Sequence, residues 1–459
     1  MVVKQTLVLS LVVLALTSCS SQYPYRSGKA ATETFVADSK MCPELTTASQ
    51  YRIPVAYLEI DDQGYFQDRG QVEQALATVG GAGKPKYVVV FAHGWFHSAS
   101  PDDENVHRFK CALNNIQSID SNVGQEVVGI YIGWRGESWT LPVIRYATFW
   151  DRKNTSDEVG RGSLVEFLTR LERVVKPSPD SLNKLMLVGH SFGASVVFNA
   201  IGQVLMVRFL LDAEKLASKS ETPAHSQSKP GLVSGYGDLV VLVNPAIEAT
   251  RIVPFFSSLN EYTRQQTDLF SPAQPPRLVI LSSEGDWATR ITFPAARVFS
   301  TLLEQYDNNK PLPMPYAKLL VLKQRYLARQ TMANVQEIQT HLPLRESTPG
   351  PRNGKCPPVE SNWLPTAIDE RKTEQRKEQQ PETGVGWRKV FSGSTIVLTH
   401  KGLTTPSNPL WIMAVGTELI RDHTGIANPV VICLFNELLG DPKVVNPEGR
   451  RHERYLRSK

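Results

Sequence analysis

Short apolar runs alternate with longer amphipathic segments along most of the chain. Continuous apolar runs occur at Val55–Ile60, Tyr87–Ala92, Val127–Gly133, Leu185–Val188, Leu239–Val243, Arg277–Leu281 and Leu410–Val415. Such runs, rich in β-branched residues, are typical of strands buried on both faces of a parallel sheet. Apolar residues recur at helical spacing in Gln71–Val79, Asp102–Ile119, Ser163–Val175, Phe192–Leu211 and Asn428–Leu439. This alternation predicts an α/β fold, with a doubly wound, mostly parallel sheet covered by helices on both faces.

Three polar stretches interrupt or precede this alternation. Residues 19–50 are rich in Ser and Thr, and we expect a flexible tether there. Ala213–Gly237 is predicted to be a surface loop. Residues 343–386 form a long polar insert before the last strand, in which charges of both signs alternate at Asp369–Lys377. Such a run favours a solvated, flexible insert over a binding site. The pattern otherwise predicts one domain over residues 51–440.

The N-terminus has the features of a secretory signal. Lys4 precedes the apolar run Leu7–Leu16, which is too short to span a membrane, and Thr17-Ser18-Cys19 follows. The ending Leu16-Thr17-Ser18-Cys19 resembles a bacterial lipobox. That resemblance implies removal of residues 1–18, acylation of Cys19 and a place in the cell envelope. Ser20 after the cysteine favours the outer membrane, facing the periplasm. An ordinary signal peptide is the alternative.

Charge and cysteine content narrow the possible partners. The chain has 50 Lys and Arg against 45 Asp and Glu, and a formal net charge of +5. Most of the excess lies in the tail, residues 441–459, so the body lacks the basic face that nucleic-acid binding requires. The tail either contacts anionic lipid head groups or is simply solvated.

In an oxidising compartment Cys42, Cys111, Cys356 and Cys433 allow three full pairings, and buried free thiols are the alternative.

The most informative motif is Gly189-His190-Ser191-Phe192-Gly193, which follows a predicted strand and opens a predicted helix. A tight turn there needs glycine on both sides of the serine, because a side chain would crowd the strand and helix. The turn would raise the Ser191 hydroxyl above the carboxyl end of the sheet, beside a helix N-terminus. In this motif and its setting the chain resembles the α/β-hydrolase superfamily, over most of residues 53–440.

The resemblance implies a set of partners for Ser191. His93-Gly94-Trp95 follows an early strand, so the backbone N–H groups of Trp95 and Phe192 are the expected oxyanion donors. His93 itself is expected to be structural. The acid is expected in the loop after Arg277–Leu281, at Asp286, with Glu284 as the alternative. The base is expected at His423, before the last helix, with His400 second; His341 precedes a proline-rich break.

These residues predict a membrane-anchored serine hydrolase that cleaves carboxylic esters through an acyl-enzyme, as an esterase or lipase. Lysophospholipase, thioesterase, peptidase and acyltransferase activities use the same triad. The alternative from a different class is an inactive hydrolase fold that acts as an envelope scaffold or binding module. No metal or cofactor is required, and the expected partners are an ester or lipid substrate and the membrane.

A segment after Val127–Gly133 is a candidate for substrate contact. It begins at Trp134-Arg135 and carries the aromatic residues Trp139, Tyr146, Phe149 and Trp150. These side chains could line an acyl pocket or form a lid, or merely pack a long loop. Arg135 could meet an anionic group of a substrate or pair with Glu137.

Overall fold

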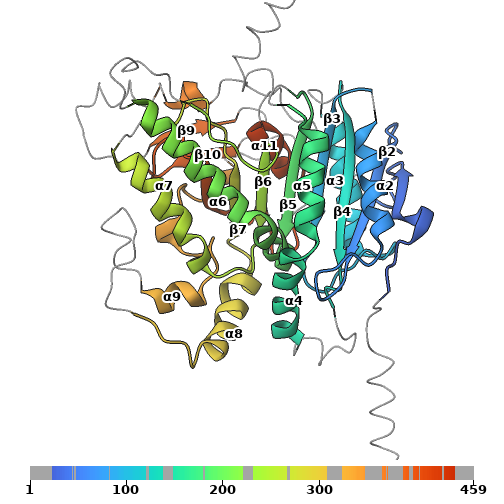
Figure 1. The fold of residues 1–459 in the computed structure, drawn as a ribbon, viewed down its shortest axis with the longest axis horizontal. Helices are drawn as coiled ribbons and strands as arrows, with labels where there is room; N and C mark the ends of the chain where they lie inside the picture. The colour runs from blue at the N-terminus through green and yellow to red at the C-terminus, as the bar shows by residue number, and fades with distance from the viewer. Residues whose placement is uncertain are drawn as a thin grey trace, which may run out of the picture.

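The fold is described here from a computed structural model of the chain (Figure 1). The described residues are 23–43, 45, 48–81, 83–119, 124–137, 148–178, 181–220, 231–265, 269–307, 323–346, 364–368, 370, 386–391, 396–402, 404–425 and 428–439. The predicted signal peptide, the acylation site Cys19, the cysteine Cys356 and the basic tail 441–459 lie outside these residues.

An eight-stranded, mostly parallel sheet forms the centre of the molecule. Its strands are β1 (Thr32–Phe35), β2 (Ile53–Ile60), β3 (Lys86–Ala92), β4 (Glu126–Trp134), β5 (Lys184–His190), β6 (Leu239–Val243), β7 (Leu278–Ser283) and β11 (Leu410–Val415). They lie in the order β1-β2-β4-β3-β5-β6-β7-β11, and every pair is parallel except β1 with β2. The seven apolar runs of the sequence are therefore strands, and the predicted α/β sheet is confirmed.

Helices cover both faces of the sheet. One cluster of buried apolar residues joins the sheet to α2 (Arg69–Gly80), α4 (Phe149–Arg161), α5 (Leu164–Val175), α6 (Phe192–Ser220) and α7 (Val253–Gln265). A second cluster joins the other face to α3 (Glu104–Gln117) and α11 (Pro429–Leu439). Helices α8 (Phe293–Ser300) and α9 (Gln324–Arg329) follow the strand β7 and lie below the sheet in Figure 1. The sequence pattern did not predict α4 or α7 as separate helices.

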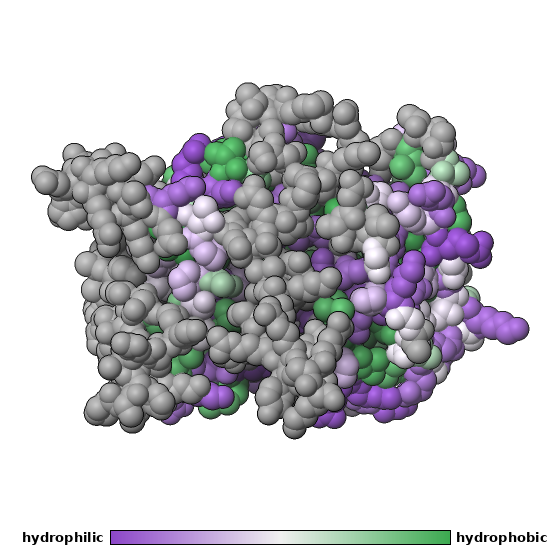
Figure 2. All heavy atoms as spheres, turned by 90° about the horizontal axis from the view of Figure 1, so that it is seen from above, coloured by the Kyte–Doolittle hydropathy of each residue, from purple (hydrophilic) through white to green (hydrophobic). Residues whose placement is uncertain are grey.

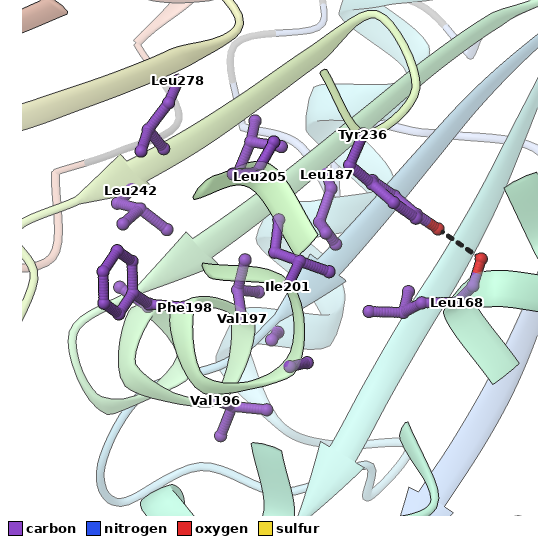
Figure 3. Close-up of a cluster of buried hydrophobic side chains, with 14 of the residues drawn as sticks. Leu168, Leu187, Val196, Val197, Phe198, Ile201, Leu205, Tyr236, Leu242 and Leu278 are labelled. Carbon is purple, nitrogen blue, oxygen red and sulfur yellow. Dashed lines mark hydrogen bonds between the residues drawn. The ribbon is translucent and has the colours of Figure 1, made fainter. Parts of the chain in front are cut away.

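Helix α6 is the central helix of the larger cluster. Its 27 residues Phe192–Ser218 are long and apolar enough to cross a membrane by length and composition alone. Instead, Val197, Ile201 and Leu205 lie against Leu187 of β5 and Leu242 of β6 (Figure 3). Figure 3 also shows the Tyr236 hydroxyl donating a hydrogen bond of 2.8 Å to the carbonyl of Leu168 on α5. Burial on the sheet explains the apolar character of this helix.

The two predicted polar interruptions are partly wrong. The loop expected at Ala213–Gly237 begins too early, because α6 continues to Ser220 and buries Ala213 completely. Within the insert predicted at residues 343–386, a short strand β8 (Arg345–Glu346) joins β9 (Trp387–Val390) and β10 (Ile396–His400) in an antiparallel sheet. Leu364, Ala367 and Ile368, from the same insert, are buried in the second cluster. A few apolar residues within the polar segment thus anchor it to the core.

The tether expected at residues 19–50 is also wrong for much of its length. Residues 28–31 form a 3-10 turn and Thr32–Phe35 form the edge strand β1, of which only Phe35 is buried. The buried carboxylate of Glu59 accepts the backbone N–H groups of Tyr25 and Arg26. Farther on, Cys42 forms a disulfide with Cys111 of α3. A short edge strand exposes most of its side chains, so its polar composition resembles that of a linker.

The disulfide is expected to stabilise the fold appreciably, because it closes a loop of 69 residues in the unfolded chain. Replacing both cysteines (Cys42→Ser with Cys111→Ser) should lower the free energy of unfolding by about 4 kcal/mol. Urea unfolding followed by circular dichroism would measure this. Each single variant should lose nearly as much as the double variant, since either one opens the same bond. Additive losses, or no loss, would contradict this role.

Candidate active site

The candidate site lies where the strand order of the sheet reverses. The chain passes from β3 to β4 on one side and returns to β5 on the other side of β3. In open α/β sheets ligands bind outside the carboxyl ends of the strands at such a point. Strand β3 leads into His93-Gly94-Trp95, and β5 ends immediately before Ser191. Both segments that the sequence analysis singled out therefore lie at the switch point.

Ser191 occupies a tight turn between β5 and α6. Its backbone has a φ of 57°, a left-handed conformation that is rare for a residue other than glycine. The adjoining glycines make the turn possible. A Cβ added at Gly189 would lie 2.6 Å from Ala194 Cα, and one at Gly193 would lie 2.1 Å from the carbonyl oxygen of Ala92. The turn thus holds the hydroxyl of Ser191 at the N-terminus of α6, as the motif predicts.

Three predicted side chains form a continuous hydrogen-bonded chain. Nε2 of His423 lies 2.8 Å from Oγ of Ser191, and Nδ1 of His423 lies 2.9 Å from Oδ2 of Asp286. With Asp286 ionised, Nδ1 carries the proton and Nε2 is free to accept one from the serine. The serine and the histidine are 232 residues apart in the sequence. This arrangement can activate a hydroxyl as a nucleophile.

Asp286 is completely buried and held by its own loop. Thr289, three residues later, donates to the carboxylate through both its hydroxyl (2.6 Å) and its backbone N–H (3.2 Å). Burial alone would raise the pKa of Asp286, but the hydrogen bonds from His423 and Thr289 outweigh it and lower the pKa below the ordinary value. The carboxylate therefore stays ionised beside the histidine. The supporting role of Thr289 was not predicted from the sequence.

The predicted oxyanion donors lie in the two segments that meet at Ser191. Gly94 is so close that an added Cβ would lie 2.9 Å from the Cβ of Ser191. Trp95 follows Gly94, and its ring centroid lies 5.8 Å from that of Phe192, the first residue of α6. The backbone N–H groups of Trp95 and Phe192 thus belong to the two turns on either side of the serine. Glycine at position 94 is required by this close approach.

Two buried side chains that the sequence analysis did not assign hold the loop of His423. The His190 Nε2–H donates to the backbone carbonyl of His423 over 2.7 Å, and the Asn244 amide donates to the same oxygen over 2.9 Å. The other end of the Asn244 amide accepts the Ser283 N–H at the end of β7. Asn244 directly follows β6, so the only feature of the sequence that could have indicated its role was a polar residue placed immediately after a buried strand. We call His190 and Asn244 the carbonyl clamp.

The alternative acid and bases are engaged elsewhere. Glu284 forms an ion pair of 2.5 Å with Arg345 rather than contacting His423. His400 lies in the small antiparallel sheet and contacts the Thr404 hydroxyl at 2.9 Å. His341 is buried beside His400 and contacts the Thr340 hydroxyl. His93 is structural, as expected: its Nδ1 lies 2.9 Å from the Gly94 carbonyl, and its Nε2 accepts the Trp134 N–H.

Aromatic side chains surround the nucleophile turn on the α4 side. Phe149, at the start of α4, packs its ring 5.3 Å from Phe192, 5.5 Å from Trp95 and 6.2 Å from Phe293 of α8. This cluster provides an apolar wall beside Ser191. Arg135 pairs with Asp62, which also binds Arg152, so it has a structural partner that the sequence analysis did not foresee. Trp139 and Tyr146, also named from the sequence, lie outside the described residues.

The side chains of the hydrogen-bonded chain bind one another, and the carbonyl clamp binds the backbone of His423. Across the described ranges, His, Cys, Asp and Glu side chains form no group of three or more that could hold a metal ion. The geometry is that of a nucleophile, a base and an orienting acid.

Four buried histidines should make the fold sensitive to acid. Burial lowers the pKa of His93 to about 4 and of His190 and His400 to about 3, and it holds the pKa of His341 well below 6.5. Unfolding returns each pKa to about 6.5, so the unfolded chain binds about four more protons near pH 5. Stability is therefore complete above about pH 6.5, and the free energy of unfolding should fall by about 5 kcal/mol per pH unit near pH 5.

Urea unfolding between pH 4.5 and 7.5 would measure this slope. Replacing His341 and His400 together by glutamine should remove about half of it, since two of the four titrating groups are lost. Replacing the partly exposed His107 by glutamine should leave it unchanged. A slope that does not respond to the double replacement would rule out these histidines as its source.

Comparison with known protein families and curated proteins identified no relative of this chain. The chain matches no protein-family model, and no curated protein matches its sequence. The conclusions about this site therefore rest on its own geometry.

Proposed function

We propose that the protein is a serine hydrolase of the α/β-hydrolase type that cleaves carboxylic esters. The observation that carries the proposal is the hydrogen-bonded chain Ser191–His423–Asp286, built on a left-handed turn between a central strand and a helix. The strand order of the sheet and the position of the turn at its switch point support the same fold type.

In the proposed first step, His423 Nε2 takes the hydroxyl proton of Ser191 while Oγ forms a bond to the carbonyl carbon of the ester. Asp286 keeps the imidazole in the correct tautomer and stabilises its cation. The negative charge on the former carbonyl oxygen would be met by the N–H groups of Trp95 and Phe192, at the positive end of α6. When the carbon–oxygen bond to the leaving group breaks, His423 gives its proton to the departing alcohol.

In the second step, a water molecule replaces the alcohol. His423 removes a proton from the water as its oxygen attacks the acyl-enzyme, and the proton then returns to Ser191 Oγ as the acid is released. Both half-reactions use the same base and the same donors. The carbonyl clamp would keep His423 in one place through both, because it fixes the backbone of that residue from two neighbouring strands.

The surroundings favour an apolar acyl group. The wall formed by Trp95, Phe149, Phe192 and Phe293 lies beside the nucleophile, and Trp95 is the member of it that keeps partial exposure. Together with the predicted acylation of Cys19, this supports an esterase or lipase held at the bacterial cell envelope, with the outer membrane as the proposed site. The same triad would serve a thioesterase, a peptidase or an acyltransferase, which a substrate series can separate.

Removing the nucleophile should abolish the activity. Ser191→Ala is expected to lower kcat for p-nitrophenyl esters by about 10⁴-fold or more, and to prevent covalent labelling by a fluorophosphonate probe. Asp286→Asn should also lower kcat strongly, because the histidine loses its orienting charge. A series of acyl chains from two to sixteen carbons would give the preferred length.

Matched variants serve as controls for these losses. Ser195→Ala replaces the next serine of α6, whose hydroxyl contacts Asp157, and should keep the labelling. Glu284→Gln and His400→Asn change the alternative acid and base and should keep the turnover. If the intact protein shows no ester turnover and no labelling, that result would refute the hydrolase proposal and favour an envelope scaffold. Labelling without ester turnover would point to a peptidase or an acyltransferase.

The carbonyl clamp should matter for rate rather than for substrate binding. Asn244 has a φ of 48°, so Asn244→Gly removes the amide without straining the backbone. We expect kcat to fall by about 10- to 100-fold, with KM changed little, because His423 would lose one of its two backbone restraints. Asn199→Ala, which disturbs a separate network with Asp157 and Arg251, is the control. Equal kcat in both variants would show that the clamp does not position the base.

A further inference from the structure

The segment that follows Asp286 exposes apolar side chains. Trp287, Ile291, Phe299, Leu302 and Leu303 are each between 63% and 96% exposed. Trp287 precedes the π-helical turn at residues 288–292, and the others lie in that turn, in α8 and in the turn after α8. We call these five residues the apolar ridge. Large exposed apolar side chains gathered on one element are uncommon in soluble proteins and mark interaction sites.

The ridge residues all lie within residues 287–303. Val298 of α8 is exposed among them, so this segment presents apolar side chains over most of its length. Phe293, at the start of α8, is buried and packs against Phe149. The segment is therefore attached to the wall of the candidate site through Phe293, while the apolar ridge is exposed.

Basic residues border the apolar ridge. Arg290 is exposed on the same turn, and Lys323 and Arg325, on the neighbouring α9 segment, are exposed as well. Lys323, Arg325 and Arg329 line an open hollow of about 470 Å³ that also contacts Val298. Nearby acidic residues are Glu304, which contacts Tyr306 and Arg297, and Asp307. Basic residues thus outnumber acidic ones around the ridge.

We propose that the apolar ridge and its basic border dock onto an anionic phospholipid surface. Exposed aromatic and branched apolar side chains, with arginine and lysine beside them, fit the interface of a bilayer, where the apolar groups enter and the cations meet phosphates. The charge of the border selects a lipid surface over an uncharged protein face. At the opposite edge of the molecule, the described surface is mostly polar with scattered apolar spots (Figure 2). Docking does not depend on the proposed hydrolysis.

Such docking would fix the orientation of the molecule. Trp287 directly follows Asp286, so the ridge begins next to the hydrogen-bonded chain of the candidate site. The site would then face the lipid. A predicted acyl anchor at Cys19 would only keep the protein near a membrane, whereas this surface would decide which side points toward it.

Vesicle flotation would test the docking. The full chain carrying Cys19→Ser, so that no acyl anchor contributes, is mixed with vesicles of phosphatidylcholine alone or with 30% phosphatidylglycerol. In that background, a ridge variant (Ile291→Ser, Phe299→Ser, Leu302→Ser and Leu303→Ser together) should bind the anionic vesicles about tenfold less. A border variant, Lys323→Gln with Arg325→Gln, should lose severalfold on anionic vesicles and little on neutral ones.

The control is Val207→Ser with Leu211→Ser, which replaces two apolar residues of α6 that are 54% and 59% exposed. It should bind as the parent does, and thermal melting should show every variant to be folded. Equal binding by the ridge variant and this control would overturn the proposal. So would sedimentation showing that the ridge variant changes only self-association, which would identify a second copy of the chain as the occupant.

Discussion

The candidate site depends on one backbone constraint, the left-handed conformation of Ser191 between β5 and α6. Holding a serine in this conformation costs on the order of 1 kcal/mol or more, and contacts in the surrounding structure have to offset this strain. They do so through close packing: the backbone at Gly189, Gly193 and Gly94 approaches its neighbours at distances that no Cβ would allow. The Ser191 N–H also donates to the Val243 carbonyl of β6. The nucleophile is thus placed by the central strands themselves.

The base is positioned by a different means, because it reaches the site on a loop. The loop of His423 is held through backbone carbonyls, by the carbonyl clamp at His423 and by Arg108 of α3 at Thr424. The Ser283 hydroxyl binds the Ile420 carbonyl of the same segment. Buried donors that satisfy loop carbonyls fix the backbone of His423 without engaging its imidazole. The imidazole remains free to exchange protons with the serine.

The sequence predicted the central elements well, because buried parallel strands leave an unmistakable apolar pattern. The runs at Tyr87–Ala92 and Leu185–Val188 are strands, and the residues that follow them meet at Ser191 as expected. The geometry of Asp286 and His423 also matches the expectation. The pattern could not predict the roles of polar residues whose partners lie far away in the sequence. The edge strand β1 resembles a linker, and the roles of Asn244 and Thr289 depend on contacts across the fold. Arg135 likewise pairs with Asp62, which lies 73 residues away in the sequence.

The disulfide between Cys42 and Cys111 has a mechanical consequence for a protein held by its N-terminus. Strand β1 lies at the edge of the sheet and pairs only with β2, so a pull from the N-terminal side would open its hydrogen bonds one after another. The opening would stop at Cys42, because the load then passes through a covalent bond into α3. Beyond that point the tension bypasses β2 and the rest of the sheet. Residues 23–41 would extend under such a load, while the part of the chain that holds Ser191 would keep its structure.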